Sequence, residues 1–181
     1  MSLNILLLSA TDYEHNCKHI NKVPIHLTGI GKTNAGVTTT RLIQEHNPDI
    51  VINFGSCGNL KNFKLGEVLR VSSVVNDLDT KGFYIPEELH LPGKTKGVKC
   101  LSTDHMYDPS DNHLDSYSDR INECDVVDME LYSIVKSCNL ANKIVYSYKW
   151  VSDDGSQDQW LKYAKLGFES FKKMLIKEHN L

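Results

Sequence analysis

The sequence predicts an α/β domain in which helices pack on a mostly parallel or mixed β-sheet. Short apolar runs typical of buried strands alternate with segments of helical periodicity, and glycine-rich turns follow several strands. The chain has 181 residues, of which 40% are hydrophobic and 24% are charged. This composition is that of a globular protein, and no linker or repeat divides the chain. We therefore expect residues 1–181 to form a single domain.

The first third of the chain predicts a strand, helix, strand unit. Its elements are a strand at Asn4–Ser9, a weaker strand at Val23–Thr28, a helix at Asn34–His46 and a buried strand at Asp49–Phe54. The helix is expected to stop before Pro48, because a proline disfavours helical conformation in the preceding residue. The next segment, Gly55–Gly58, is predicted to be a tight turn that exposes Ser56 and backbone N–H groups to a ligand.

The rest of the chain continues the alternation. β-branched residues at Glu67–Asn76 indicate one longer strand, and the aperiodic stretch Asp77–Gly97 predicts a long surface loop. The later elements are expected to be a brief strand at Val98–Leu101, a weakly patterned helix at Asp111–Asn122, a helix from Leu131, a strand at Lys143–Val151 and a final helix at Asp158–Lys177. The last helix carries an apolar stripe that predicts a core-facing side. This stripe comprises Trp160, Ala164, Phe168, Phe171 and Leu175.

Charge and hydropathy exclude several classes of partner. The net charge of −3 gives no field that would attract a nucleic acid or an acidic membrane. The longest apolar run, Ile5–Leu8, is far shorter than the ~20 residues of a membrane span, and no leader pattern precedes it. These features predict a cytoplasmic protein that binds neither nucleic acid nor membranes.

Cysteine usage indicates reduced thiols. The five cysteines are an odd number and include no CxxC pair, so neither a disulfide framework nor a zinc site is expected. Free cysteines are usually buried, and we expect that here, with no bound metal.

Two glycine-rich motifs suggest more specific chemistry. Gly29–Thr33 ends like a phosphate-binding P-loop, but His26 stands where that motif needs its first glycine, so a nucleoside triphosphatase is not expected. Its glycines would instead let the backbone approach a small ligand or another strand. Ser56 or Cys57 would need a histidine base to act as a nucleophile, and none of the eight histidines lies in a recognisable partner motif.

Three acidic residues stand where strand ends and helix starts should converge. Glu14 follows the first strand, Glu130 opens the helix at Leu131, and Asp153 follows the strand ending at Val151. Taken singly, each would be a solvated carboxylate favoured by a helix dipole. Ligands of α/β sheets collect at the carboxyl ends of strands, so the carboxylates and glycine turns together predict a binding site there.

These motifs together resemble the purine nucleoside phosphorylase and nucleosidase superfamily, and most closely its methylthioadenosine/S-adenosylhomocysteine nucleosidase branch. The matching stretches run in the family's order over about four-fifths of the chain; they are Thr28–Ala35 with Thr38–Leu42, Asp49–Leu60, Leu65–Val68, Ser102–Asp104, Val127–Glu130 and Val151–Asp153. The resemblance implies a three-layer α/β/α fold with a mixed central sheet, like that of nucleoside phosphorylases. It also implies cleavage of the bond between a purine and a ribose, with no metal or organic cofactor, in a homodimer.

The resemblance assigns catalytic roles to two carboxylates. Glu14 would be the general base that activates water at the anomeric carbon, and Asp153 would give a proton to the purine N7, with Ser152 helping to place it. An aspartic acid is ionised near neutral pH, and raising its pKa by about three units costs roughly 4 kcal/mol. Asp153 must therefore sit in a shielded pocket or bind the protonated base in a concerted step.

The resemblance also implies a set of substrate-binding residues. Glu130 and Met129 would hold the ribose, Ser56 would lie near the sugar and the water, and Met106 and Tyr107 would line the base pocket. The chemistry is consistent with these assignments, because cleavage builds positive charge on the sugar and negative charge on the leaving base. A site for this reaction needs carboxylates around the sugar and an acid at the base.

Water is the expected nucleophile. Phosphorylases of the superfamily carry an arginine before the Gly-Ser turn, where a fixed cation binds phosphate, and this chain has Asn53 at that position. The sequence thus predicts a nucleosidase that hydrolyses 5′-methylthioadenosine, S-adenosylhomocysteine or a similar purine nucleoside. A phosphate-dependent phosphorylase is the alternative enzyme.

Departures from the family pattern leave a nucleoside-binding module without activity as a further alternative. Ser152–Ser156 lacks the family's second acid and places Asp154 beside Asp153, while Lys149 takes the place of an arginine. The segments between Glu14 and Thr28 and between Asp79 and Asp104 are also shorter than in typical members. A pocket altered in this way could bind a nucleoside without cleaving it.

Overall fold

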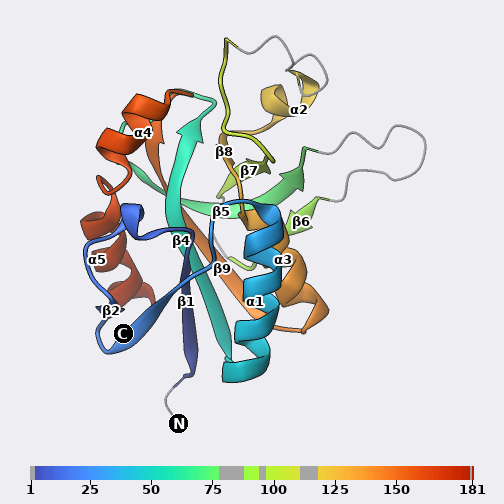
Figure 1. The fold of residues 1–181 in the computed structure, drawn as a ribbon, viewed down its shortest axis with the longest axis vertical. Coiled ribbons are helices and arrows are strands. Elements are labelled where there is room, and N and C mark those ends of the chain that lie inside the picture. Colours follow the sequence, from blue (N-terminus) through green and yellow to red (C-terminus); the bar gives the residue numbers. More distant parts are fainter. Residues whose placement is uncertain (1–2, 78–87, 94–96, 111–117, 180) are drawn as a thin grey trace, which may run out of the picture.

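The computed structural model describes residues 3–77, 88–93, 97–110, 118–179 and 181. A central β-sheet runs through the molecule, with helices on both of its faces (Figure 1). Its first elements are β1 (Ile5–Ser9), the short 3-10 helix η1 (Asp12–Glu14), β2 (His19–Ile20), β3 (Val23–Leu27), α1 (Lys32–His46), β4 (Ile50–Asn59) and β5 (Val68–Asn76). The later elements are β6 (Leu89–His90), β7 (Val98–Ser102), α2 (Ser118–Glu123), β8 (Val126–Asp128), α3 (Leu131–Leu140), β9 (Ile144–Asp153), α4 (Gln157–Tyr163) and α5 (Phe168–His179).

The sheet is mixed, as the sequence predicts. Its strand order is β2-β3-β1-β4-β8-β7-β5-β6, and β9 pairs with both β4 and β5. β1 runs parallel to β3 and β4, and β9 runs parallel to β4, whereas the β4–β8 and β5–β9 pairings are antiparallel. Because β4, β8, β7, β5 and β9 pair in a closed circuit, this part of the sheet curls on itself.

Helices cover the sheet on two sides and create two apolar cores. On one face, α1 and α3 pack against the sheet through buried residues such as Leu42, Ile134 and Val135. On the other face, α5 buries Phe168, Phe171 and Leu175 among the aromatic side chains of β4 and β9. Phe54 and Phe171 stack there with ring centroids 4.6 Å apart. The expected three-layer arrangement is therefore present.

The glycine-rich segment after Phe54 is strand rather than the turn that the sequence predicts. β4 continues to Asn59, and its backbone pairs with β9 on one side and β8 on the other, so that Gly58 lies opposite both Asp153 and Val127. A register shift between Cys57 and Gly58 marks the point where β8 joins. Two flanking strands hold this segment extended despite its low strand propensity.

The predicted final helix is two helices, α4 and α5, because the chain breaks beside Trp150. A Cβ on Gly167 would lie 2.3 Å from the Cβ of Trp150, so only glycine allows this close approach. The Trp150 indole N–H also donates to the carbonyl of Ala164 at 2.7 Å. α4 can therefore take a direction different from that of α5.

Most of the remaining predicted elements are confirmed where the structure describes them. The segment expected to be a loop at 77–97 instead contains the short strand β6, because Leu89–His90 pairs with β5; residues 78–87 and 94–96 of this segment lie outside the described residues. Of the helix expected at 111–122, residues 111–117 lie outside them, and the described part is α2. All five cysteines are free thiols, and four are buried while Cys17 is half-buried. Among the described residues, no helix has the length and hydropathy to span a membrane.

Candidate functional site

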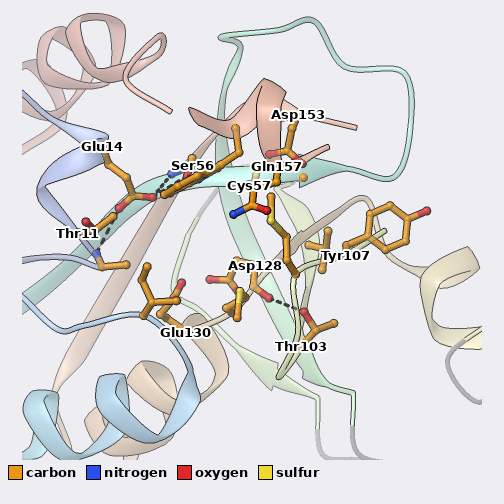
Figure 2. A pocket seen from close by; sticks show the side chains of 17 residues that line it. Thr11, Glu14, Ser56, Cys57, Thr103, Tyr107, Asp128, Glu130, Asp153 and Gln157 are labelled. Carbon is orange, nitrogen blue, oxygen red and sulfur yellow. Dashed lines mark hydrogen bonds between the residues drawn. The ribbon is translucent and has the colours of Figure 1, made fainter. Parts of the chain in front are cut away.

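A cavity of about 210 Å³ lies at the carboxyl ends of β1, β4, β8 and β9. Its walls come from the β1–η1 corner, the end of β4, the segment after β7, the β8–α3 junction and α4 (Figure 2). Glu14, Glu130 and Asp153 all line it, although they are far apart in the sequence. The convergence predicted from the sequence is therefore present in the structure.

Glu14 is buried and held by four hydrogen-bond donors. Its Oε1 accepts from the backbone N–H and the hydroxyl of Ser56, each at 2.7 Å, and its Oε2 accepts from the Ser9 hydroxyl at 2.8 Å and the Ala10 N–H at 3.3 Å. A Cβ on Gly55 would lie 2.6 Å from Oε1, so β4 makes room for this carboxylate with a glycine. These contacts fix the Glu14 side chain in one position at the cavity wall.

Asp153 is also buried, but it has fewer donors. Its Oδ2 accepts from the Ser152 hydroxyl at 2.7 Å, and its Oδ1 accepts from the Gly155 N–H at 3.0 Å. Burial, with the charge of Asp154 as a smaller contribution, raises the pKa of Asp153 despite these two hydrogen bonds. Gly155 has a φ of 103°, and a Cβ there would meet Pro109 at 2.3 Å. A glycine is therefore required at position 155, in the turn that directs its backbone N–H at Asp153.

Glu130 lies between β8 and α3 and turns toward the glycine turn before α1. Its Oε1 accepts from the Gly31 N–H at 2.8 Å, and this turn is left-handed, with a φ of 91° at Gly31. Burial raises the pKa of Glu130 to about 7, and the neighbouring charge of Asp128 adds to the rise. Lys149 and the Gly31 N–H act in the opposite direction. The glycine turn thus holds a cavity carboxylate through the Gly31 N–H.

A buried ion pair supports the floor of the cavity. Lys149 Nζ lies 2.7 Å from Asp128 Oδ2, with both side chains almost fully buried. The Ser102 hydroxyl donates to Asp128 Oδ1 at 2.6 Å, and the Leu131 N–H donates to Oδ2 at 3.0 Å. Burial disfavours the ammonium, but the carboxylates of Asp128, Glu130 and Glu14 outweigh it and raise the pKa of Lys149. Lys149 therefore stays charged at the position where the family pattern has arginine.

The other residues predicted from the sequence fall into two groups. Ser56, Met106, Tyr107 and Met129 line the cavity together with the three carboxylates. Ser152 stands behind the wall, where its hydroxyl contacts Asp153 and lies 3.2 Å from the Cys57 carbonyl.

Asp154 and Ser156, the polar residues of the segment that lacks the family's second acid, do not line the cavity. Asp154 is exposed, and the Ser156 hydroxyl caps α4 by accepting from the Gln159 N–H.

Sequence reasoning missed several residues that line the cavity, among them Asp128, Gln157 and Trp160. Asp128 lies within the matched Val127–Glu130 motif without an assigned role, and Gln157 opens α4. Trp160 was placed in the core-facing stripe, but it is only half-buried and lines the cavity beside Ser56. The apolar spacing that assigned Trp160 to the core does not indicate the break between α4 and α5.

The charge of the cavity wall is one-sided. Glu14, Asp128, Glu130 and Asp153 line it, and the described lining residues include no lysine, arginine or histidine. No cluster of histidine, cysteine, aspartate or glutamate suited to a metal ion occurs among the described residues. The arrangement can stabilise a positive charge on a ligand and can exchange protons with it.

A three-layer α/β fold with carboxylates gathered at the strand ends defines a class of small-molecule-binding proteins. Within this class, the family model of the Phosphorylase superfamily matches residues 15–116. This match covers more than half of the chain, and the chain therefore belongs to the Phosphorylase superfamily.

Two relatives found by sequence share one name. A 5′-methylthioadenosine/S-adenosylhomocysteine nucleosidase of Anoxybacillus flavithermus is 26% identical over 84% of this chain and 79% of its own length. A protein of the same name from Staphylococcus saprophyticus is 34% identical over 46% of this chain. The match spans 37% of the length of that second relative.

Solved structures share the fold at lower identity. The 5′-methylthioadenosine/S-adenosylhomocysteine nucleosidase of Neisseria meningitidis, solved with methylthio-immucillin-A, has a TM-score of 0.78 and 22% identity, covering 94% of this chain and 96% of that one. A futalosine hydrolase mutant of Helicobacter pylori has a TM-score of 0.78 and 18% identity, covering 96% and 98%. These likenesses show the fold, which both kinds of protein share.

Proposed function

We propose that this protein is a purine nucleosidase that uses water to cleave the N-glycosidic bond of 5′-methylthioadenosine, S-adenosylhomocysteine or a similar nucleoside. The observation that carries the proposal is the convergence of Glu14, Glu130 and Asp153 on one cavity. The reaction builds positive charge on the sugar, which carboxylates stabilise, and negative charge on the base, which an acid neutralises. The names of the relatives support the same activity.

Glu14 is proposed as the general base. Its two oxygens are fixed by the four donors described above, so the carboxylate presents one geometry to the cavity. In this role, Glu14 takes a proton from the water that attacks the anomeric carbon. Ser56, whose hydroxyl is 2.7 Å from Glu14, would lie near the same water and the sugar.

Asp153 is proposed as the acid for the purine N7. Its burial and raised pKa support this role, because a protonated carboxyl group must persist toward neutral pH. The Ser152 hydroxyl contacts Oδ2 and the Gly155 N–H contacts Oδ1, which orients the group. Met106 and Tyr107 would line the base pocket on this side of the cavity.

Glu130 is proposed to accept hydrogen bonds from the ribose hydroxyls, with Met129 beside it. Both residues line the cavity at the β8–α3 junction. The Gly31 N–H occupies Oε1 of Glu130, which leaves Oε2 for a ligand hydroxyl. The ribose would then lie between Glu130 and Glu14.

Water is favoured over phosphate as the nucleophile. A phosphate site needs a fixed cation, and the described lining residues provide none. Asn53, at the position of the phosphorylase arginine, is buried within the sheet. Its amide donates to the Leu8 carbonyl at 3.4 Å and accepts from the Ser147 hydroxyl at 3.0 Å. These contacts turn the side chain to the sheet interior.

The protein is further proposed to act in the cytoplasm as a homodimer. Apolar side chains on the β3–α1 segment support association, since Leu27, Ile30 and Val37 are 46%, 48% and 68% exposed. The resemblance also implies that the loop around Asp77–Gly93 meets the partner subunit, and residues 78–87 of this loop lie outside the described residues. Light scattering on the purified chain tests the dimer; a monomer at micromolar concentration would contradict it.

The decisive experiment measures base release from a panel of purine nucleosides, with and without phosphate. We expect release of free adenine from 5′-methylthioadenosine or S-adenosylhomocysteine at a rate that phosphate does not change. A rate that depends on phosphate would indicate a phosphorylase. Tight binding of adenine with no product after long incubation would indicate a binding module and overturn the proposal.

A further inference from the structure

Trp160 of α4 reaches the cavity beside the proposed base. Its indole Nε1–H donates to the Ser56 hydroxyl oxygen at 2.9 Å, and the Ser56 hydroxyl lies 2.7 Å from Glu14 Oε1 (Figure 2 shows Ser56 and Glu14). An indole N–H is a donor only, so the Ser56 oxygen accepts from it and its single proton is free to donate to Glu14. The three side chains therefore form a hydrogen-bond chain with one direction.

The contrast with Trp150 shows that this contact is not ordinary core packing. Trp150 is fully buried, and its indole N–H donates to a backbone carbonyl, that of Ala164. Trp160 is half-buried and donates to a cavity hydroxyl 104 residues away in sequence. Its ring also lies 6.0 Å from that of Tyr13, the residue before Glu14. Trp160 of α4 therefore makes two separate contacts near Glu14, the proposed general base: one with Ser56 and one with Tyr13.

We propose that Trp160 is a positioning residue that acts on Glu14 through Ser56. A serine hydroxyl rotates freely unless a partner sets its direction. The indole N–H occupies the Ser56 oxygen, and this leaves Glu14 as the acceptor for the Ser56 proton. The inference rests on the proposed function, because it assumes that Glu14 is the base.

Loss of this hydrogen-bond chain should affect turnover more than substrate binding. Without the indole N–H, the Ser56 hydroxyl is free to turn toward water or a substrate hydroxyl, and Glu14 keeps only the backbone N–H of Ser56 on Oε1. A misplaced catalytic group lowers the rate of the chemical step, whereas the cavity wall keeps its shape if an aromatic ring remains. The expected signature is a lower kcat with little change in KM.

The kinetic test uses Trp160→Phe, which keeps a ring and removes the N–H. We expect kcat to fall about tenfold and KM to change less than about twofold. The matched control is Leu161→Ala on the same helix, because Leu161 is 54% exposed and does not line the cavity. A Trp160→Phe enzyme with the kcat of the control, or one that changes only KM, would overturn the inference.

A double-mutant cycle separates positioning from simple support of α4. If Trp160 acts through the Ser56 hydroxyl, Trp160→Phe should have almost no further effect on kcat in a Ser56→Ala background. Additive losses would mean that Trp160 acts independently of Ser56. Thermal unfolding of every variant shows whether each one is folded under the assay conditions.

An arm without catalysis distinguishes failure of the inference from failure of the proposed function. The chain has two tryptophans, so an ¹⁵N-labelled sample gives two indole N–H signals. We expect Ser56→Ala and Glu14→Gln each to shift the Trp160 signal and to leave the Trp150 signal in place. If Glu14→Gln leaves the Trp160 signal unchanged, the hydrogen-bond chain is absent and the inference fails, whether or not the wild-type protein releases base.

Discussion

Glu14 and Asp153 face the same cavity from opposite corners, and their surroundings differ. At the β1–η1 corner, Glu14 accepts four hydrogen bonds, two of them from Ser56. At the β9–α4 corner, Asp153 accepts two, and burial raises its pKa. The Glu14 corner surrounds its carboxylate with hydrogen-bond donors, whereas burial at the Asp153 corner raises the pKa of that carboxyl group and so favours its protonated form.

In the proposed mechanism, this difference lets two carboxyl groups serve opposite proton transfers. A base must be ionised before reaction, and an acid must be protonated. In the proposed mechanism, the different surroundings of the two carboxylates divide these tasks between them. The surroundings of Glu130 have a third effect. Burial raises its pKa to about 7, so its charge is sensitive to pH in the neutral range.

Neutralising each carboxylate in turn tests the proposed division of roles most directly. We expect Glu14→Gln and Asp153→Asn each to lower kcat for a purine nucleoside by at least about a hundredfold while the fold stays intact. Base release measures the activity, and circular dichroism checks the fold. Wild-type rates in both variants would refute the assignment of roles.

A change of leaving group tells the two variants apart. A nitrophenyl riboside departs as a stable anion and needs no protonation, so its hydrolysis should be nearly insensitive to Asp153→Asn. Glu14→Gln should still lose most of the rate, since water activation is needed for either substrate. Equal losses on both substrates would show that the two corners are not specialised as proposed.

The pH profile tests the acid corner directly. With a purine nucleoside, kcat should fall about tenfold per pH unit once pH exceeds the pKa of Asp153, because only the protonated group can donate. Desolvation raises that pKa, so the fall should begin above the range of an exposed aspartate. The nitrophenyl riboside is the control and should lack this alkaline limb; a limb of equal steepness with both substrates would assign it to another group.

A smaller effect, on the free energy of unfolding, is expected from Glu130. Its pKa is raised from 4.5 to about 7 in the folded protein, so the folded state holds an extra proton between these values and stability falls as pH rises through them. Glu130→Gln removes this loss, and we expect it to stabilise the protein by about 1 to 3 kcal/mol at about pH 8, with little gain at about pH 4. Urea unfolding at both pH values measures the difference, and a gain of equal size at both would contradict the explanation.

Local patterns were sufficient for most of the fold. The apolar runs at β1 and at the start of β4, the periodicity of α3 and the proline after α1 each predict an element that the structure contains. The end of β4 was predicted wrongly because Gly55–Gly58 has the composition of a turn. Its extended conformation depends on β8 and β9, which reach it from more than sixty residues away.

The site was predicted only in part, because some of its residues are placed by tertiary contacts. The motifs identified Glu14, Glu130 and Asp153, since each ends or begins an element at the same edge of the sheet. Trp160 was missed because its spacing fits the stripe of α5, and the break that separates α4 depends on contact with Trp150. Such a break is a tertiary effect without a local signal.

The glycine at position 55 ties two distant parts of the gene together. Any other residue there would place its Cβ 2.6 Å from Glu14 Oε1, so a substitution at position 55 is blocked as long as Glu14 keeps its place. A relative that replaced Glu14 with a shorter side chain would lift that block. Evolutionary change at positions 14 and 55 should therefore occur in pairs, and a lone substitution at 55 would mark a protein whose Glu14 has moved.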